Sequence, residues 1–328
     1  MRSQVRSLLS VTLLLSAGAF DVVGWYVGKN TTQFPISSIR WDVYTTVVLP
    51  GGPSVSPLGL ASCQPDEFHT AMLAQAQLNG RTLTWGGAVD VAALLFNASF
   101  AQFRSTYLAS LGTAARACNV TSIEFDYECP ATPEGRAGVV TPAQADAYTV
   151  FLISVLASLD EAGVVNATVS ADIGVWGLDG AIGKGSSYPL ELAPWINATK
   201  IALHPRIFLN TMSYHTPDSC SILPWQLDGL IMSDVWGVPK GQINLGIGFY
   251  SFAAGGAEPT WLSLAQQCPG IAPSDCHCDG IAFASKAQCF SIGAWAKERG
   301  FRGLFPWALN YDAIGEDALI DWVGRGIA

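Results

Sequence analysis

Three acidic residues stand at alternate positions in the stretch TSIEFDYECP, which begins at residue 121. They are Glu124, Asp126 and Glu128. Residues two apart on a β-strand point to the same face, so the three carboxyl groups would lie together. Like charges at this spacing cannot all ionise cheaply, and at least one pKa must rise. A carboxylic acid that stays protonated near neutral pH can act as a general acid.

Two structural explanations compete with catalysis, namely a solvated edge strand and a buried ion pair. The opposite face of the strand carries Ile123, Phe125 and Tyr127, which do not suit a solvated edge. The stretch contains no Lys or Arg that could form an ion pair. We therefore favour catalysis over structural burial.

Eight short runs of β-branched and aromatic residues recur along the chain, and Ala/Leu-rich segments with helical periodicity separate them. Alternating strands and helices imply a parallel sheet, and eight such units predict an α/β protein with a single-domain (β/α)8 TIM barrel. An open doubly wound sheet is the second choice, because no glycine-rich fingerprint follows the first run. The active site of a TIM barrel lies at the C-terminal ends of its strands. The expected strands are 20–27, 41–49, 81–87, 120–128, 167–176, 206–214, 243–250 and 301–309.

One expected helix has clear signals at both ends. Thr141 followed by Pro142 suits an N-cap with proline in the first turn, and Gly163 suits the C-terminal cap.

The N-terminus has the layout of a secretory signal peptide. Two arginines precede an apolar run at 8–15, and small residues follow at 17–19. We expect residues 1–19 to be cleaved off as a signal peptide and residues 20–328 to form the catalytic barrel. The apolar run is too short to cross about 30 Å of hydrocarbon, and no other stretch looks able to span, so we expect no stable membrane insertion. The predicted location is extracellular or the lumen of the secretory pathway.

Composition narrows the choice of partners. The net charge is -9, and no Lys/Arg cluster is present, so nucleic acid is not an expected partner. Half of the residues are hydrophobic and 13% are charged, which fits one large core under a thin polar shell. We expect a monomer.

The cysteine content suits an oxidising compartment, since the chain has eight cysteines. Cys268, Cys276, Cys278 and Cys289 crowd together, and with His277 they could form a zinc cluster. Their spacing fits no ordinary CxxC pair, so we favour disulfides that pin a long loop, and we expect no metal and no cofactor. Five sequons predict a glycoprotein, although Asn119 and Asn166 precede expected strands and are doubtful sites: Asn30, Asn97, Asn119, Asn166 and Asn197.

The acidic stretch resembles the signature D-x-x-D-x-D-x-E of glycoside hydrolase family 18, the chitinase-like enzymes, which lies on the fourth barrel strand. Asp126 matches the third aspartate and Glu128 the catalytic acid. Two positions depart from the signature, because Thr121 and Glu124 stand in place of its first and second aspartates.

Other expected strands carry similar motifs in the same order. TWGG, with Gly86 and Gly87, is similar to the third-strand S-x-G-G of the family. NTMSYHTPD resembles the sixth-strand M-x-Y-D/N, with Met212 and Tyr214 retained and His215 in the acidic or amide place.

The last two strands extend this resemblance over nearly the whole mature chain. LGIGFYSF is similar to the seventh-strand G-x-P-x-Y, with Gly246 and Tyr250 matching and Gly248 in place of proline. GLFPWALNYD places Trp307 where the family has the tryptophan that forms the floor of its site.

The resemblance implies a retaining hydrolysis of β-1,4 links next to N-acetylglucosamine, in which the acetamide oxygen of the substrate is the nucleophile. Glu128 would protonate the leaving oxygen and later activate water. Asp126 would hold the acetamide N–H, and Glu124 would share a proton with Asp126. Tyr214 would hold the acetamide oxygen, and Trp307 would lie under the sugar ring.

The remaining substrate-binding expectations concern aromatic residues and neighbours of the motifs. Trp25, Trp85 and Trp176 fall near strand ends, so sugar stacking is plausible for some of them. Asp172 either lines the barrel or hydrogen-bonds to groups that do. The expected substrate-binding residues are Trp307, Tyr250, Trp25, Gly86, Gly87, Met212 and His215.

Three functions remain open at this point. The first is a secreted hydrolase of chitin degradation that acts on chitin or on other glycans that contain N-acetylglucosamine. The second is an endo-β-N-acetylglucosaminidase that acts on N-glycans. The third is a catalytically inactive lectin on the same barrel, which the departures at Thr121, Glu124 and His215 leave possible.

Overall fold

The structure is a computed structural model of the chain. It describes residues 20–29, 31–87, 89, 91–127, 141–174, 196–214, 220–251 and 259–328.

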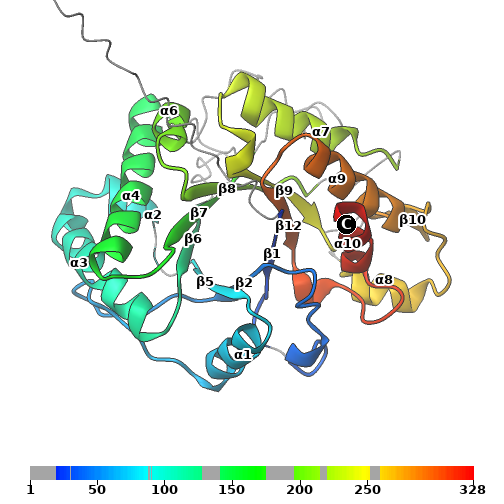
Figure 1. Cartoon of the computed structure of the whole chain (residues 1–328), viewed down its shortest axis with the longest axis horizontal. Coiled ribbons are helices and arrows are strands. Elements are labelled where there is room, and N and C mark those ends of the chain that lie inside the picture. The colour runs from blue at the N-terminus through cyan, green and yellow to red at the C-terminus, as the bar shows by residue number, and fades with distance from the viewer. Residues whose placement is uncertain are drawn as a thin grey trace, which may run out of the picture.

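Eight parallel strands form a closed barrel in the order β1-β12-β9-β8-β7-β6-β5-β2, and helices lie outside this ring (Figure 1). This arrangement confirms the predicted (β/α)8 barrel. The barrel strands are β1 (Asp21–Trp25), β2 (Thr46–Pro50), β5 (Thr82–Gly86), β6 (Ser122–Asp126), β7 (Thr168–Ile173), β8 (Ile207–Thr211), β9 (Ile243–Gly248) and β12 (Gly303–Trp307). Two small antiparallel pairs lie outside the barrel, β3 (Ser54–Val55) with β4 (Ala61–Ser62) and β10 (His277–Cys278) with β11 (Ile281–Ala282).

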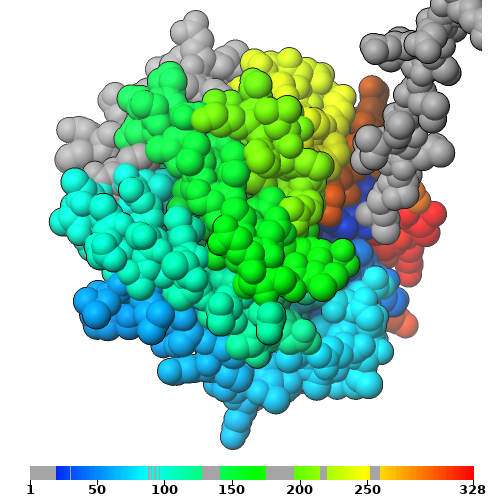
Figure 2. Space-filling model, turned by 60° about the vertical axis from the view of Figure 1, so that its left-hand side comes forward, coloured from blue at the N-terminus to red at the C-terminus, as the bar shows by residue number. Residues whose placement is uncertain are grey.

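Helices cover the outer face of the barrel, and Figure 2 shows α3 and α4 side by side on one flank of the molecule. Gly112 on α3 donates its backbone N–H to Ser158 Oγ on α4 over 3.1 Å. The α-helices are α1 (Glu67–Leu78), α2 (Val91–Phe96), α3 (Ala101–Ala117), α4 (Pro142–Glu161), α6 (Ala198–Ala202), α7 (Leu223–Leu230), α8 (Trp261–Gln267), α9 (Lys286–Glu298) and α10 (Leu319–Ile327). Shorter turns are the 3-10 segments η1 (Ile36–Ser38), η2 (Ala98–Phe100), η4 (Lys240–Gln242) and η5 (Leu309–Tyr311), and the π-helical turn η3 (Ile231–Val235).

The second barrel strand is shorter than predicted. It begins at Thr46, whereas the sequence pattern indicated a strand from Trp41. The backbone N–H groups of Val43 and Tyr44 both bond to the carbonyl of Arg40, so the chain makes a turn there. Trp41 and Tyr44 extended the strand-like pattern in the sequence, but in the structure they are buried in the core without lying in a strand.

Helix α4 has the ends that the sequence predicted. Thr141 and Gln144 form a reciprocal capping box, and Gly163 follows the helix in the left-handed region at φ 72°. Contrary to the expectation from sequence, α4 is long and apolar enough to cross a membrane by length and composition. In the structure one face of α4, which includes Phe151 and Leu152, is buried in the core of the domain, whereas Val150 is exposed.

The inward and outward faces of β6 separate as the strand period predicted. Ile123, Phe125 and Tyr127 are buried on the helix side, where Phe125 packs against Phe151 of α4 with ring centroids 5.1 Å apart. Glu124 points into the barrel and is fully buried. The outer apolar layer thus fixes which way the acidic residues face.

Three disulfides are present in the described part of the chain, at Cys63–Cys118, Cys220–Cys276 and Cys268–Cys278. The prediction that the C-terminal cysteines pair as disulfides is confirmed for two of these bonds and is wrong for Cys289, which is a free thiol buried in α9. Cysteine spacing does not reveal that a thiol on a helix faces the core.

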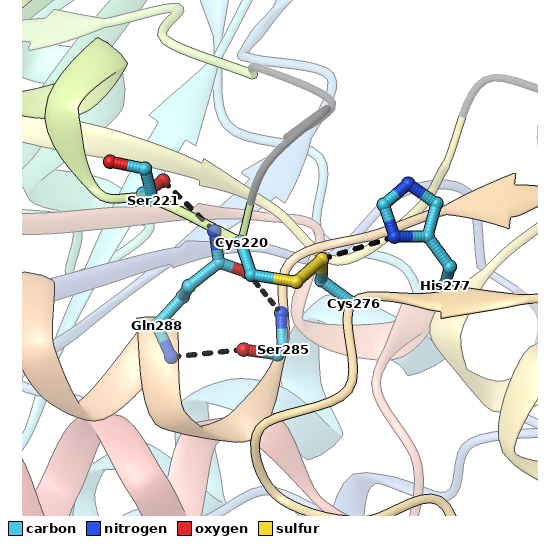
Figure 3. The surroundings of a disulfide bond; sticks show 6 residues. All are labelled: Cys220, Ser221, Cys276, His277, Ser285 and Gln288. Carbon is cyan, nitrogen blue, oxygen red and sulfur yellow. Dashed lines mark hydrogen bonds between the residues drawn. A yellow bond between two sulfur atoms is a disulfide. The ribbon is translucent and has the colours of Figure 1, made fainter.

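The Cys220–Cys276 bond ties the segment after β8 to the Cys-rich segment before α9 (Figure 3). A hydrogen bond of 2.9 Å from Gln288 Nε2 to the Ser221 carbonyl joins the same two regions. Gln288 is also the reciprocal capping partner of Ser285 at the start of α9. The helix start and the disulfide together anchor the chain that leaves β8.

Candidate active site

Glu124 is the centre of a buried hydrogen-bond network inside the barrel. The indole N–H of Trp25 on β1 donates to its Oε1 atom. Ser170 Oγ on β7 and Asn210 Nδ2 on β8 both donate to its Oε2 atom, each over 2.8 Å. Glutamate has one methylene more than the aspartate of the family signature. The longer side chain at 124 lets the carboxylate reach donors on strands β1, β7 and β8.

Burial governs the ionisation of Glu124. It raises the pKa of this carboxyl to about 7, while the three donated hydrogen bonds oppose the rise. The charge of Asp126 raises the pKa further. Asp126 is the last residue of β6 and is half-buried, so it lies nearer the mouth of the barrel than Glu124 does. The predicted sharing of a proton between Glu124 and Asp126 stays a prediction.

Two amide side chains of the network, Asn210 and Asn244, were not singled out from the sequence. Asn210 is fully buried and bonds to both Glu124 and Asp172, and Asn244 on β9 donates to Asn210 Oδ1 over 2.8 Å. A signal was present, because Asn210 stands two and four residues before Met212 and Tyr214 on the expected inward face of its strand.

The predicted site residue Gly86 is required by close packing against Trp25. A Cβ at Gly86 would lie 2.2 Å from the Cη2 atom of the Trp25 ring, and the ring is held by its bond to Glu124. The next residue, Gly87, has φ 47°, in the left-handed region that favours glycine. The two glycines therefore make room for Trp25 and turn the chain as it leaves β5.

An aromatic cluster lies beside this network at the C-terminal ends of the strands. The ring centroids of Trp25 and Trp307 are 5.3 Å apart, and those of Tyr214 and Trp307 are 6.1 Å apart. Tyr250 lies 6.1 Å from Tyr214. The structure thus brings together four residues that the sequence assigned to catalysis or substrate binding, from β1, β12 and the segments after β8 and β9.

Tyr214 stays protonated in this setting. Burial raises the pKa of its phenol well above the usual value, and the nearby carboxylates, Asp172 first among them, raise it further. A neutral phenol can donate a hydrogen bond to a carbonyl oxygen. Met212 is half-buried and packs against the larger apolar layer of the domain, whereas Tyr214 packs against the interior aromatic cluster.

Several predicted residues lie outside the described part of the chain or away from the site. Glu128, His215 and Trp176 are outside the described residues. Trp85 was a candidate for sugar stacking, and this is wrong, because its ring lies in the outer apolar layer, 6.3 Å from that of His69 on α1. Thr121 precedes β6 at the opposite end from Asp126, so its departure from the signature does not touch the mouth.

A polar cavity of about 300 Å³ lies below Glu124, toward the N-terminal ends of the strands. Threonine and serine hydroxyls line much of it, and Arg302 pairs with Asp21 over 2.7 Å at its edge. Aliphatic layers usually fill the interior of a TIM barrel. In this barrel, polar side chains line the space below the carboxylates instead.

The cysteine clusters do not offer a metal site in this oxidised form. Cys220, Cys276 and His277 lie close together, as do Cys268, Cys278 and Asp279. All four of these cysteines are in disulfides, and a disulfide sulfur is not the thiolate that zinc requires. The geometry therefore agrees with the preference for disulfides over a zinc cluster.

We expect the protein to unfold more easily at about pH 8 than at about pH 5. Burial raises the pKa values of Glu124 and Asp312 to about 7 and raises that of Asp172 as well. The native state thus holds protons that the unfolded chain releases near pH 4, so stability falls as the pH rises through the folded pKa values. His69 acts in the opposite direction, because burial lowers its pKa. Thermal unfolding followed by circular dichroism across this range measures the sum, and a midpoint that rises toward pH 8 would contradict the expectation.

Comparison with solved structures supports the barrel and its strand order. A plant class V chitinase mutant from Cycas revoluta, in complex with (GlcNAc)3, matches with a TM-score of 0.73 at 15% identity, over 94% of this chain and 100% of its own. The fold is that of the family 18 chitinases. A chitinase from Bacteroides thetaiotaomicron matches with a TM-score of 0.69 at 12% identity, over 94% of this chain and 96% of its own. The family 18 chitinase ChiB of Flavobacterium johnsoniae matches with a TM-score of 0.68 at 14% identity, over 94% of each chain.

Sequence comparisons add nothing to this likeness. No protein-family model matches the chain, and no curated protein matches it in sequence. The similarity to family 18 chitinases is therefore one of fold, and the arguments for activity come from the residues of the site.

Proposed function

We propose that this protein is a chitinase-like glycosidase that hydrolyses β-1,4 links next to N-acetylglucosamine. The observation that carries the proposal is the position of β6, which has the fold context of family 18 chitinases and turns Glu124 into the barrel below Asp126. A buried carboxylate network at the mouth of such a barrel supports proton transfer and charge stabilisation. The Cycas revoluta structure was solved with (GlcNAc)3, which supports a substrate of this class.

In the proposed reaction, the acetamide oxygen of the substrate attacks the anomeric carbon while the bond to the leaving oxygen breaks. Glu128 gives its proton to that oxygen, and it then takes a proton from the water that opens the oxazolinium-like intermediate. Asp126 binds the acetamide N–H and stabilises the developing positive charge. Tyr214 donates to the acetamide oxygen, and the Trp307 ring packs under the sugar.

Turnover assays on two substrates test this proposal. We expect the protein to release shorter oligomers from chitotetraose. Cleavage only of a high-mannose glycoprotein would instead identify an endo-β-N-acetylglucosaminidase. Binding of chitotetraose without turnover of either substrate would identify a lectin and would overturn the hydrolase proposal.

We further propose that the protein is secreted as a monomer after cleavage at Ala19, and that it carries glycans. The sequon residues Asn97, Asn119 and Asn166 are exposed. Asn197 is engaged instead, because its Nδ2 atom donates to Asp146 over 2.9 Å and its Oδ1 atom caps α6. We expect a mature N-terminus at Phe20 and an unmodified Asn197, which mass spectrometry of the protein from the medium would check. Retention of residues 1–19 would contradict the cleavage.

A further inference from the structure

Four polar residues form one row around the inside of the barrel. Asp126, Asp172, Asn210 and Asn244 are register partners on the neighbouring strands β6, β7, β8 and β9. Partners in parallel strands point to the same face, so all four side chains point inward. Asp172, Asn210 and Asn244 are each at most 1% exposed. Asp172 is therefore a third carboxyl group in the same buried space as Glu124 and Asp126.

Each carboxylate oxygen of Glu124 faces an N–H group that can only donate. The indole N–H of Trp25 meets Oε1, and the amide Nδ2 of Asn210 meets Oε2. Neither an indole N–H nor an amide NH2 can accept a hydrogen bond. These two donors therefore favour Glu124 as the proton acceptor of the cluster.

The orientation of the Asn210 amide is fixed by its other neighbour. Asn244 Nδ2 donates to Asn210 Oδ1 over 2.8 Å. The Nδ2 atom of Asn210 then points at the carboxylates, 2.8 Å from Glu124 Oε2 and 3.0 Å from Asp172 Oδ1. A flipped amide would set its oxygen against two carboxylates, so the direction of donation is determined.

Asp172 and Glu124 share the Asn210 Nδ2 donor, so the two carboxyl groups lie close together and cannot both ionise cheaply. Glu124 also accepts from Trp25 and Ser170, and these two further donors stabilise its ionised form. The difference in donors places the proton on Asp172. Asp172 has one oxygen, Oδ1, that accepts from Asn210, and this leaves its other oxygen to carry the proton.

We propose that Asp172 is a positioning residue that keeps its proton while Glu124 and Asp126 ionise. A neutral Asp172 removes one negative charge from the cluster, so that Asp126 can be anionic at the mouth. The effect of Asp172 on catalysis rests on the proposed function. The presence of a proton on Asp172 does not depend on that function. Neither the acidic motif on β6 nor its matching strands assigns a role to this residue.

The groups that face Asp172 agree with this order of ionisation. Burial is the first cause of its raised pKa, followed by the charges of Glu124 and Asp126 on β6. Tyr148 of α4 and Tyr214 after β8 also lie within electrostatic range, and both phenols have raised pKa values. Each of these four neighbours is acidic or neutral. The Asn210 amide does favour an ionised Asp172, but it donates to Glu124 as well and over a shorter distance.

Infrared spectroscopy can detect this proton without any substrate. At about pH 8, one unit above the pKa of about 7 of Glu124, we expect a protonated-carboxyl C=O band in the wild-type protein. The band should vanish in Asp172→Asn and persist in Glu124→Gln. A wild-type protein without the band, or a band that survives in Asp172→Asn, would overturn the proposal. If Asp172→Asn does not fold, the Glu124→Gln variant is sufficient for the test, and loss of the band in that variant would overturn the proposal.

Kinetics then test the positioning role. Asparagine is isosteric with a neutral aspartic acid and can accept from Asn210 through its Oδ1 atom, so Asp172→Asn should keep kcat within about threefold of wild type. The alkaline limb of its pH profile should move up by about one unit or more, because no carboxyl remains at 172 to ionise. Asp172→Ala, which cannot accept from Asn210 and leaves a gap beside Glu124, should lose at least about tenfold in kcat. Equal losses in both variants would contradict the role, and absence of turnover in the wild type would count against the proposed function while leaving the infrared result valid.

Discussion

Replacement of Glu128 by glutamine should lower kcat on chitotetraose by about 10²–10⁴-fold, with binding of the oligomer retained. This is the range that a positioned general acid supplies, and glutamine has no proton of suitable pKa to give. The substitution preserves the size of the side chain, so the loss should be in kcat rather than in the affinity for substrate.

The matched control for this substitution is Glu161→Gln. Glu161 is exposed at the C-terminal end of α4, and the same chemical change there should leave kcat unaltered. Circular dichroism and oligomer binding would establish that both variants are folded. Turnover by Glu128→Gln at the wild-type rate would remove Glu128 from the mechanism and leave Asp126 and Glu124 as the groups to examine.

The fold could be predicted from sequence because its signals are local. Each strand is a short run of β-branched or aromatic residues, and each helix between strands has its own periodicity and caps, as Thr141 and Gly163 do for α4. The direction of Glu124 followed from the period of two along β6, because Phe125 had to face the helices. These inferences needed no knowledge of which segments lie side by side.

The partners of Glu124 could not be predicted, because they come from distant parts of the chain. Trp25 is 99 residues away from Glu124, and Asn210 is 86 residues away. Only closure of the barrel brings these donors to one carboxylate, and sequence patterns do not specify which inward residues meet. The failed expectation for Trp85 has a related cause, since a tryptophan near a strand end can face either side and the register decides which.

Closure of the barrel also determines the role of the carboxylate at 124 as a hydrogen-bond acceptor. Two N–H donors and one hydroxyl converge on it, so the site is built around an acceptor with two equivalent oxygens. An aspartate at this position, as in the family signature, would be one methylene shorter. Glutamate at 124 and the tryptophan at 25 are therefore matched to each other, with Gly86 leaving the space for the ring.

Replacement of Glu124 by glutamine tests this match and should lower the free energy of unfolding by about 1–3 kcal/mol. The glutamine NH2 must face either the indole N–H of Trp25 or the amide of Asn210, and whichever donor it meets loses its acceptor while buried. Ser170→Ala is the matched control, because it removes one donor and leaves both N–H groups paired, so its cost should be smaller, about 1 kcal/mol or less.

Chemical denaturation of the two variants measures this difference, and the pH dependence supplies an independent check. Burial raises the pKa of Glu124 to about 7, so the native carboxyl binds a proton that the unfolded chain has already released, and stability falls as the pH rises. Glutamine cannot titrate, so Glu124→Gln should show a shallower loss of stability than wild type between about pH 5 and about pH 8. If Glu124→Gln is as stable as wild type and has the same pH slope, then Glu124 neither accepts from both N–H donors nor titrates in the folded barrel, and the network loses its central member.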